Sequence, residues 1–494
     1  MKAVIGKQLD GGKWHLGEGT SWERRSPATG DPVWVGQWSS FGQLDQAIAE
    51  AQSAFGGWAE SHLEDRMTFC RAFAQYVHQH QSELAHLIAI ETGKPLWEAR
   101  TEAAAVQSKV DNSIDALLHR RWTTTGPSGD YMAVTRFRPH GVLLVLGPFN
   151  LPAHLPGAHI VPALLAGNTV VFKPSEHTPA TGQWLASAWQ HAGLPPGVLN
   201  MVHGSSEIGQ QAVADERIAG VLFTGSYQVG VQIHRTLAGR PEKLLALELG
   251  GNNPLVVHRT SDFRRAAITA VMSAYITSGQ RCTCARRLIV TGREDFEKLS
   301  CELLQLIPKI KVGLPLDEIE PFMGPLIHGE AASRMLTAQN QLLAVPGCHS
   351  LITMQTSECC PAMLTPGLME IPETAVIPDC EHFGPLLLMQ CAEDLEHATE
   401  IANRTKFGLA AGFLGDSVDD FHFFLHRVRA GIVNWNRQTT GASGRLPFGG
   451  IGQSGNHHPS GYFAADYCSY PVASLESHDM SEASRLLPGL DFGA

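Results

Sequence analysis

The spacing of apolar residues divides the chain into a helical first part and a strand-rich remainder. Between residues 42 and 90 apolar side chains recur at helical spacing, which predicts amphipathic helices that carry Leu44, Ile48, Ala51, Phe55, Phe69, Phe73 and Leu84. Gly93 and Pro95 interrupt this pattern before a second helical segment, 97–118. A stretch rich in Gly, Pro and Thr, 123–129, then ends the helical block.

From Arg138 onwards the pattern changes to short β-branched runs separated by turns and Ala/Leu-rich segments. The predicted strands form two series, 142–146, 169–172, 198–202 and 221–223, then 254–257, 288–290, 386–389 and 431–434. Strands that alternate with helical segments are typical of parallel βαβ units. We therefore predict two α/β domains, the first with a dinucleotide-binding fold.

The bulk composition agrees with a large protein of several domains. A chain of 494 residues exceeds what one hydrophobic core usually serves, so two or three domains are expected. Charged residues make up 17%, below the roughly 25% of an average soluble protein, which favours buried subunit interfaces and an oligomer. The net charge of -11 opposes binding to nucleic acid or to an anionic membrane surface.

A cytoplasmic location is expected because the N-terminal residues lack the apolar run of a signal peptide. The ten cysteines show no compact spacing pattern, so they are expected to be reduced thiols. The most apolar stretch, 141–172, is broken by prolines and glycines, and we do not expect it to span a membrane.

The segment 221–230 has the pattern of a buried strand, a Gly-Ser turn and the start of a helix. Gly225 permits a tight turn, and the N–H groups exposed at a helix start can bind a pyrophosphate. Its Gly-x-x-x-x-Gly spacing differs from the common Gly-x-Gly-x-x-Gly motif, so an ordinary strand–helix corner explains the segment equally well.

Glu248 and Cys282 are candidates for a base and a nucleophile. Glu248 precedes paired glycines, where the backbone can turn closely around a small site, although a lone glutamate is more often a solvated surface charge. Cys282 lies in a turn-like segment beside three cations that are expected to lower the pKa of its thiol, Arg281, Arg286 and Arg287. Cys284 is an equal candidate on this reasoning. No second Cys pair or His cluster has metal-ligand spacing, so no metal site is predicted.

Eight short motifs follow one another along the chain. They are Gly-Pro-Phe-Asn-Leu-Pro (147–152), Leu-Ala-Gly-Asn (165–168), Phe-Lys-Pro-Ser-Glu (172–176), Phe-Thr-Gly-Ser (223–226) with Gly230, Glu-Leu-Gly-Gly (248–251), Gly-Gln-Arg-Cys (279–282), Glu-His-Phe-Gly-Pro (381–385) and Pro-Phe-Gly-Gly (447–450) with Ser-Gly (454–455). In this order and approximate spacing the chain resembles the aldehyde dehydrogenase superfamily over nearly its whole length. The resemblance implies an α/β fold with a Rossmann-type NAD-binding domain, an α/β catalytic domain and a small oligomerisation arm.

The resemblance also implies a covalent mechanism. Cys282 follows Gly-Gln-x and would attack the aldehyde, whereas Cys284 falls on a position that need not be cysteine. Asn150 and the backbone N–H of Cys282 would stabilise the oxyanion. After hydride leaves for the nicotinamide, Glu248 would activate the water that hydrolyses the thioester.

For the cofactor, the resemblance assigns Lys173 and Glu176 to the adenosine ribose and Glu381 to the nicotinamide ribose, with Phe383 also in the cofactor site. The pyrophosphate would lie on Gly225, Ser226, Tyr227, Gln228, Val229 and Gly230. A carboxylate at Glu176 accepts from ribose hydroxyls and repels a 2′-phosphate, so NAD is favoured over NADP.

Departures from the commoner family members indicate the substrate. Phe149 stands where many members have Trp, Asn252 and Asn253 follow the paired glycines, and Arg281 precedes the nucleophile. These features resemble one branch whose small-molecule aldehyde carries two further carboxylates, so cations or oriented amides are expected in the substrate tunnel. The candidates are Arg281, His159 and Arg437. A surface or interface role explains Arg437 equally well.

By the same resemblance, residues 1–119 with 139–250 form the NAD-binding domain and 251–449 the catalytic domain. Residues 120–138 with 450–494 form an oligomerisation arm and tail, in a homodimer or a dimer of dimers. Two other functions stay open. One is an NAD(P)-dependent dehydrogenase of another anionic semialdehyde, succinic or glutamic, and the other is a catalytically silent relative with a binding or structural role.

Overall fold

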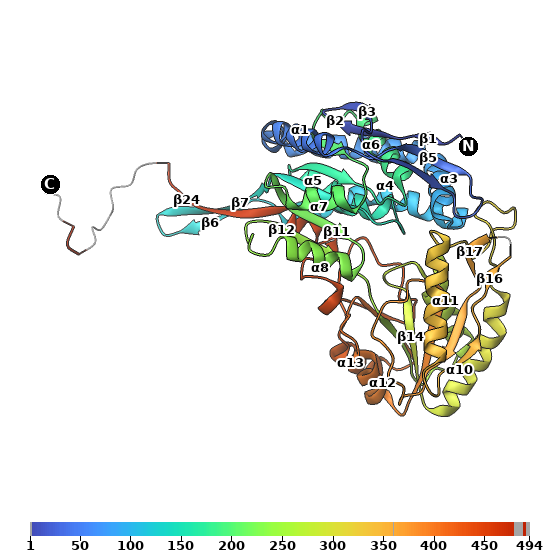
Figure 1. Ribbon diagram of the computed structural model, residues 1–494. Coiled ribbons are helices and arrows are strands. Elements are labelled where there is room, and N and C mark those ends of the chain that lie inside the picture. The colour runs from blue at the N-terminus through green and yellow to red at the C-terminus, as the bar shows by residue number, and fades with distance from the viewer. Residues whose placement is uncertain (1, 359, 479–487, 491–494) are drawn as a thin grey trace.

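The computed structural model describes residues 2–358, 360–478 and 488–490, and it consists of two lobes and a projecting arm (Figure 1). Each lobe is built on a seven-stranded sheet covered by helices. This arrangement confirms the predicted α/β fold. Part of the predicted tail, 479–487 and 491–494, lies outside the described residues.

The first lobe contains a sheet in the order β12-β11-β8-β9-β10-β2-β3. Five strands are parallel, namely β8 (Val142–Leu146), β9 (Thr169–Lys173), β10 (Leu199–Met201), β11 (Ile218–Thr224) and β12 (Leu244–Glu248). Two antiparallel strands from the start of the chain extend it, β2 (Lys7–Asp10) and β3 (Lys13–Leu16). The four strands predicted in this region are confirmed, whereas the two N-terminal strands carry no alternating pattern that predicted them.

Helices cover both faces of this sheet. One face carries α2 (Leu63–Gln79), α3 (Gln81–Thr92), α4 (Leu96–Arg120), α5 (His154–Leu165) and α6 (Pro179–His191), and the other α1 (Phe41–Glu60), α7 (Ser206–Ala214) and α8 (Tyr227–Thr236). Successive strand residues point to opposite faces, so Leu143 and Val145 of β8 belong to one core and Val142 and Leu144 to the other. The predicted helical region 42–90 is three helices, the first of which begins at a capping box of Ser40 and Gln43.

The second lobe repeats this plan with a sheet in the order β15-β18-β19-β14-β13-β20-β21. Its parallel strands are β13 (Asn253–Val257), β14 (Ala285–Thr291), β18 (Gly367–Glu370), β19 (Leu386–Ala392), β20 (Ala410–Leu414) and β21 (Ile432–Trp435), and β15 (His349–Ile352) is antiparallel. One face carries α9 (Phe263–Tyr275) and α10 (Arg293–Leu306), and the other α11 (Gly329–Leu343), α12 (Leu395–Asn403) and α13 (Val418–Arg427).

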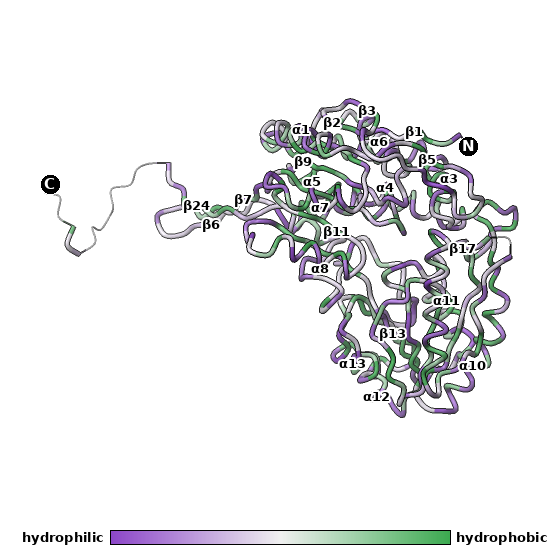
Figure 2. The backbone as a smooth tube through the Cα atoms, viewed as in Figure 1, coloured by the Kyte–Doolittle hydropathy of each residue, from purple (hydrophilic) through white to green (hydrophobic). Residues whose placement is uncertain are grey.

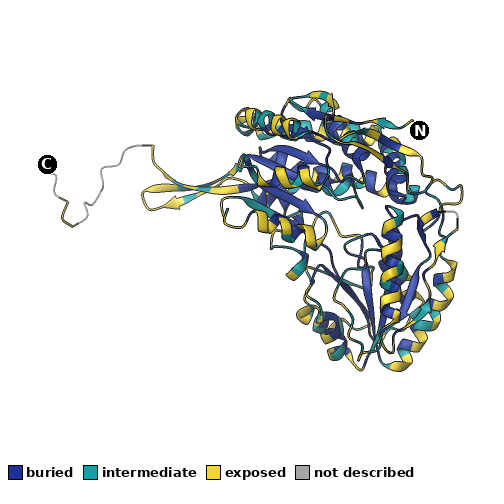
Figure 3. Ribbon diagram, in the orientation of Figure 1, coloured by how far each residue is buried: buried dark blue, intermediate teal, exposed yellow. Residues whose placement is uncertain are grey.

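The arm is a three-stranded antiparallel sheet that joins the end of the chain to its first third. Its order is β24 (Ser469–Glu476), β7 (Tyr131–Pro139) and β6 (Thr124–Ser128). The Gly/Pro/Thr-rich stretch 123–129 contains the edge strand of this sheet, because β6 pairs in a hairpin with β7, whose other side pairs with β24. Figure 3 shows this arm largely exposed, whereas the central strands of both lobes are buried and appear hydrophobic in Figure 2.

Short elements complete the chain. They are β1 (Val4–Ile5), β4 (Ser21–Arg25) and β5 (Pro32–Gln37) in one small sheet, the pairs β16 (Thr356–Ser357) with β17 (Cys360–Leu364) and β22 (Pro447–Phe448) with β23 (Ser460–Gly461), α14 (Ala464–Tyr467), and 3₁₀ turns at Ile276–Gly279, Ile307–Lys309 and Gly452–Ser454. Within the described ranges, no helix combines the length and apolar character that crossing a bilayer requires.

Candidate active site

A cavity of about 790 Å³ is lined by residues of both lobes. The first lobe contributes segments at the carboxyl ends of β8, β9, β11 and β12, where ligands bind in open parallel sheets. The second lobe contributes the loops before β14 and β19. Asn150, Glu248 and Cys282 all line this cavity, so the structure brings the three predicted catalytic residues together.

Cys282 follows a strained turn that aims it at the cavity. Thr277, Ser278 and Gly279 are consecutive residues with φ of 56°, 52° and 74°, a left-handed conformation that is costly for the first two. Gly279 must lack a side chain, because a Cβ there would lie 2.0 Å from the carbonyl oxygen of Gly384. The turn is held by its own side chains, since Thr277 Oγ1 donates to the Glu98 carboxylate and Ser278 Oγ donates to the backbone carbonyl of Gly324 at 2.6 Å.

Asn253 holds the same loop from the other side. Its Nδ2 donates to the carbonyls of Cys282 at 2.6 Å and Cys284 at 2.9 Å, and its Oδ1 accepts from the N–H of Ala410 at 3.0 Å. This residue is one of the departures noted in the sequence. Cys284 is fully buried and does not line the cavity, which separates it from Cys282 by position.

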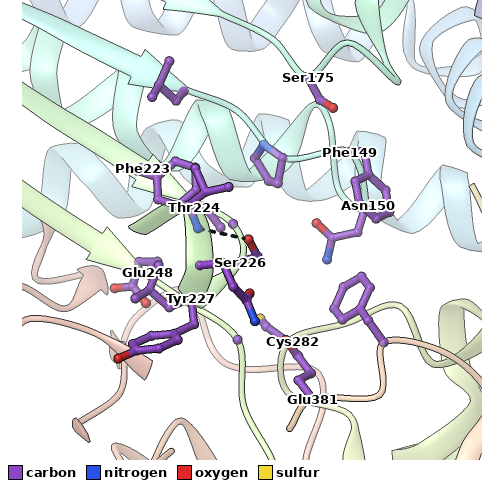
Figure 4. A pocket seen from close by; sticks show the side chains of 18 of the residues that line it. Phe149, Asn150, Ser175, Phe223, Thr224, Ser226, Tyr227, Glu248, Cys282 and Glu381 are labelled. Atoms are coloured by element: carbon purple, nitrogen blue, oxygen red, sulfur yellow. Dashed lines mark hydrogen bonds between the residues drawn. The ribbon is translucent and has the colours of Figure 1, made fainter. Parts of the chain in front are cut away.

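Asn150 and Glu248 approach the cavity from the first lobe. Asn150 Nδ2 donates to the carbonyl of Gln280 at 2.9 Å, which leaves its second N–H free to meet a substrate. Glu248 Oε1 accepts from the N–H of Ser460 at 2.9 Å, while Oε2 is buried and has no hydrogen-bond partner among the residues that the structure describes. Burial raises the pKa of Glu248 well above its usual value. In Figure 4 the amide of Asn150 and the thiol of Cys282 border the same space, whereas the Glu248 carboxylate points away from Cys282.

The expectation that three arginines lower the pKa of the Cys282 thiol is wrong. Burial and the nearby charges of Glu381 and Glu248 raise this pKa to about 12, and among the three arginines only Arg286 is a cause that lowers it. Arg281 instead donates to Glu98 and Thr277. Arg287 donates to backbone carbonyls of Asn252, Ile401 and Ala402. Cys282 is therefore in its thiol form at neutral pH.

This protonation state predicts the reactivity of Cys282. Because only the thiolate is alkylated, we expect the rate with iodoacetamide to rise about tenfold per pH unit from pH 7 to pH 9 without a plateau. Glu381→Gln should accelerate the reaction at fixed pH, because it removes a charge that raises the thiol pKa. Mass mapping of the Cys282 peptide separates this thiol from the exposed Cys301. A plateau below pH 8 would contradict the prediction.

The predicted cofactor residues lie around the same cavity with one exception. Lys173, Glu176, Gly225, Ser226, Tyr227, Gln228, Val229, Glu381 and Phe383 line it. Gly230 does not, and a Cβ there would lie 2.6 Å from Leu249, so this glycine permits close packing instead. Lys173 Nζ and Glu176 Oε2 are 3.8 Å apart, and Ser226 caps α8 by accepting from the N–H of Val229.

The three candidate substrate residues do not line this cavity. His159 is buried, and its ring nitrogens bond Tyr467 Oη and Thr224 Oγ1, each at 3.0 Å, so its placement contradicts a direct substrate contact. Arg281 is paired with Glu98 at 2.7 Å, which already compensates its charge. Arg437 is exposed and donates to the carbonyl of Gly441 at 2.9 Å.

The structure adds a buried ion pair that sequence reasoning missed. Lys94 Nζ lies 2.6 Å from both Glu102 Oε2 and the backbone carbonyl of Asn150, and Glu102 Oε1 accepts from the N–H groups of Ala153 and His154. Glu98 and Glu102 lie one turn apart on the buried face of α4. Charged residues on an otherwise apolar helix face were a visible signal that the analysis of periodicity did not use.

We predict that Glu102→Gln lowers kcat about 10- to 100-fold, because Lys94 loses its carboxylate and the Asn150 loop loses its support. The cost in unfolding free energy is expected to be about 3–5 kcal/mol, as for a buried charge that loses its partner. Steady-state kinetics with thermal unfolding measure both effects. Glu320→Gln, in an exposed pair with Arg100, is the matched control and should leave both unchanged. Unchanged kcat in Glu102→Gln would exclude the positioning role.

Comparison with known proteins identifies the class. The model of the aldehyde dehydrogenase family matches residues 14–471, and the chain belongs to this family of oxidoreductases. A named relative is N-succinylglutamate 5-semialdehyde dehydrogenase of Yersinia pestis, 45% identical over 481 residues, which cover 97% of this chain and 95% of the relative. The family resemblance stated from the sequence is confirmed.

Solved structures agree on the fold and differ in their cofactors. A 1-pyrroline-5-carboxylate dehydrogenase from Thermus with bound NAD superposes with a TM-score of 0.90 at 27% identity, covering 96% of this chain and 93% of that chain. An NADP-dependent enzyme of E. coli superposes with a TM-score of 0.91 at 28% identity, covering 96% and 98%. Both nicotinamide cofactors thus occur among the structural relatives.

Proposed function

We propose that this enzyme oxidises N-succinylglutamate 5-semialdehyde to N-succinylglutamate with NAD, through a thioester on Cys282, in arginine catabolism. The observation that carries the mechanism is the convergence of Asn150, Glu248 and Cys282 on one cavity between the lobes. The choice of substrate is supported by the named relative, whose sequence is 45% identical to this chain over 97% of its length.

The chain's own groups account for the acyl chemistry. Cys282 Sγ bonds to the aldehyde carbon while its S–H proton passes to solvent in the cavity, and the carbonyl electron pair moves to oxygen. Asn150 Nδ2 and the N–H of Cys282 donate to that oxygen. A bound NAD would supply the acceptor for the hydride of this carbon, which is the two-electron oxidation that the thioester level requires. Glu248 then takes a proton from water, whose oxygen attacks the thioester and releases the carboxylic acid and the Cys282 thiolate.

The residues around the cavity fit a dinucleotide. The cavity is lined at the N-terminus of α8 by residues 225–229, and the N–H groups and dipole of a helix N-terminus favour a pyrophosphate. Gly225 keeps this corner tight, because a Cβ would lie 2.3 Å from the Phe223 ring. Glu176, with Lys173, would receive the adenosine ribose, and buried Glu381 the nicotinamide ribose.

The charge of Glu176 predicts cofactor preference. Burial acts to raise the pKa of Glu176, but Lys173 acts against it, and the net pKa is lowered, so this carboxylate is charged at neutral pH. We expect Glu176→Gln to raise kcat/KM for NADP relative to NAD about 10-fold or more, because a repulsive charge is removed. Glu216 is an exposed glutamate in the loop between α7 and β11, so Glu216→Gln should leave the ratio of kcat/KM for NADP to that for NAD unchanged. An unchanged ratio in Glu176→Gln would refute the role.

The substrate assignment is tested by initial rates of NAD reduction with N-succinylglutamate 5-semialdehyde, succinic semialdehyde and glutamic semialdehyde. We expect kcat/KM to be highest for the first by about 100-fold, since two further carboxylates can be recognised. A higher value for either other aldehyde assigns the enzyme to that substrate. Binding of NAD without reduction by any of the three would indicate a catalytically silent relative.

We also propose the domain assignment from the sequence, with NAD bound by 1–119 and 139–250, catalysis in 251–449, and assembly through 120–138 with 450–494. The arm supports assembly because it exposes large apolar side chains, Tyr131, Met132 and Leu475. Light scattering is expected to show a homodimer or a dimer of dimers. The double substitution Met132→Asp with Leu475→Asp replaces two of these apolar side chains by charges. It should shift the measured molar mass towards that of the monomer.

A further inference from the structure

Two loops of the second lobe border the cavity together. The nucleophile loop, residues 277–284, carries Cys282, and the cofactor loop, residues 379–385, carries Glu381 and Phe383. All three of these residues line the cavity. The relative position of the two loops therefore decides how the cofactor contacts lie with respect to the nucleophile.

Arg286, at the start of β14, binds both loops. Its Nη1 donates to the carbonyl of Gly279 at 2.7 Å and to that of Gly384 at 3.4 Å. Its Nη2 donates to the carbonyl of Arg281 at 2.9 Å and lies 3.7 Å from Glu381 Oε1. One guanidinium can make these contacts together because its five N–H donors form a planar fork. Arg286 thus ties the nucleophile loop to the cofactor loop.

The strand that carries Arg286 is irregular at this residue. Asn253 of β13 pairs with Ala285 and the next residue, Pro254, pairs with Arg287, so β14 has one extra residue between the two pairs. Such a bulge redirects a side chain and is common beside active sites. Arg286 is only 1% exposed, and its Nε has no hydrogen-bond partner among the described residues. Since apolar residues often stabilise a core at least as well as a buried charge, stability alone does not explain an arginine here.

Arg286 also faces the carboxylate of Glu381. Within the described ranges, it is the one cation paired with this carboxylate. Burial raises the pKa of Glu381, and Arg286 is the largest cause that lowers it. The other titratable groups beside Glu381 are uncharged at neutral pH, because the thiols of Cys282 and Cys380 have raised pKa values and the pKa of His382 is lowered to about 4. The charge of Glu381 therefore depends on Arg286.

We propose that Arg286 is a positioning residue that holds Glu381 and Phe383 in place to receive the nicotinamide end of NAD. This inference rests on the proposed function, which assigns Glu381 to the nicotinamide ribose. Arg286 does not line the cavity and acts through its two neighbours. It pairs with the carboxylate of Glu381, and its guanidinium carbon lies 5.5 Å from the centroid of the Phe383 ring.

A purely structural role is the alternative, in which Arg286 only stabilises the second lobe. Arg287 is a matched control, because it is similarly buried in the same strand and its guanidinium also donates to backbone carbonyls, those of Asn252, Ile401 and Ala402. Both Arg286→Met and Arg287→Met should lower the melting temperature. Only Arg286→Met should weaken binding at the nicotinamide end.

The test measures by calorimetry the binding of NAD and of AMP, which carries only the adenosine end. For Arg286→Met we expect the Kd of NAD to rise at least about 10-fold and the Kd of AMP to stay within about twofold of the wild type. Arg287→Met should keep both values within about threefold. If Arg286→Met does not fold, Arg286→Lys replaces it, because one ammonium cannot span both loops, and the Kd of NAD should then rise at least about threefold. Equal losses of NAD affinity in the variants of Arg286 and Arg287 overturn the proposal.

The pH dependence of NAD binding supplies a readout that a structural role would not move. Glu381 accepts from ribose hydroxyls as a carboxylate, so the affinity should fall as pH drops through its pKa. Without Arg286 this pKa is higher, and the midpoint of the decline should move up by about one pH unit in Arg286→Met but not in Arg287→Met. An unchanged midpoint with unchanged NAD affinity refutes the role of Arg286.

These measurements separate the role of Arg286 from the proposed function, because they need no aldehyde. A wild type that binds NAD but does not oxidise N-succinylglutamate 5-semialdehyde contradicts the proposed function and leaves the expectations for Arg286 in force. A wild type that oxidises this aldehyde, with an Arg286→Met variant that binds NAD as tightly, contradicts the role of Arg286 alone.

Discussion

Cys282→Ala is expected to abolish NAD reduction, with kcat at least about 10⁴-fold lower, because no other group can form the covalent bond to the aldehyde. Cys284→Ala is the matched variant two residues away. It is buried outside the cavity and should retain turnover within about tenfold, with a loss of stability from the small cavity it leaves. Steady-state rates of NADH formation measure both.

The binding of NAD distinguishes a chemical defect from a folding defect in this pair. Cys282→Ala should bind NAD with a Kd within about threefold of the wild type, since the dinucleotide residues lie on other segments. Fluorescence titration provides this measurement. If Cys284→Ala loses turnover while Cys282→Ala keeps it, the nucleophile is wrongly assigned.

Glu248→Gln is expected to separate the two halves of the reaction. Thioester formation needs the thiol and the hydride acceptor, whereas hydrolysis needs a base for water. The variant should therefore form about one NADH per active site in a burst and then turn over roughly 10²- to 10⁴-fold more slowly than the wild type. Stopped-flow absorbance measures the burst, and hydroxylamine, which attacks thioesters directly, should restore turnover.

The raised pKa of Glu248 gives this prediction a pH dependence. A carboxyl group acts as a base only when ionised, so the fraction of competent enzyme increases as pH rises through the raised pKa. We expect the kcat of the wild type to rise with pH as Glu248 ionises. The slow turnover of Glu248→Gln should not show this rise. Glu400→Gln, on the surface of α12, serves as a control that retains it. A variant without a burst would place Glu248 before thioester formation.

The fold could be predicted wherever burial leaves a local pattern. The apolar run 142–146 coincides with β8 because a strand buried on both faces is apolar at every position. Strands β3 and β6 were missed for the opposite reason, because they are largely exposed edge strands without an apolar run. Strand β2 was missed because its four residues are too few for a pattern, and its place in the sheet depends on pairing with β10, far along the chain.

The sequence could predict which residues form the candidate site, but it could not predict the charges and pKa values of those residues. Cys282, Glu248 and Asn150 were each identified by short motifs, because reacting groups need particular residue types beside turns. Whether Arg281 acts on Cys282 or on Glu98, 183 residues earlier, depends on which way its side chain points in the folded protein. The arginines next to Cys282 in the sequence therefore predicted a lowered pKa for its thiol, whereas the folded protein raises this pKa.

By itself the sequence determined the family and the order of the two α/β lobes, since these depend on local periodicity and on motifs, and it predicted Cys282 as the nucleophile. Only the tertiary structure decided the charge state around Cys282 and the role of His159 as a buried hydrogen-bond bridge. The physical reason is that a charge is stabilised or destabilised by whatever surrounds it in space. For these residues the surroundings come from helices, hairpins and loops that are distant along the chain.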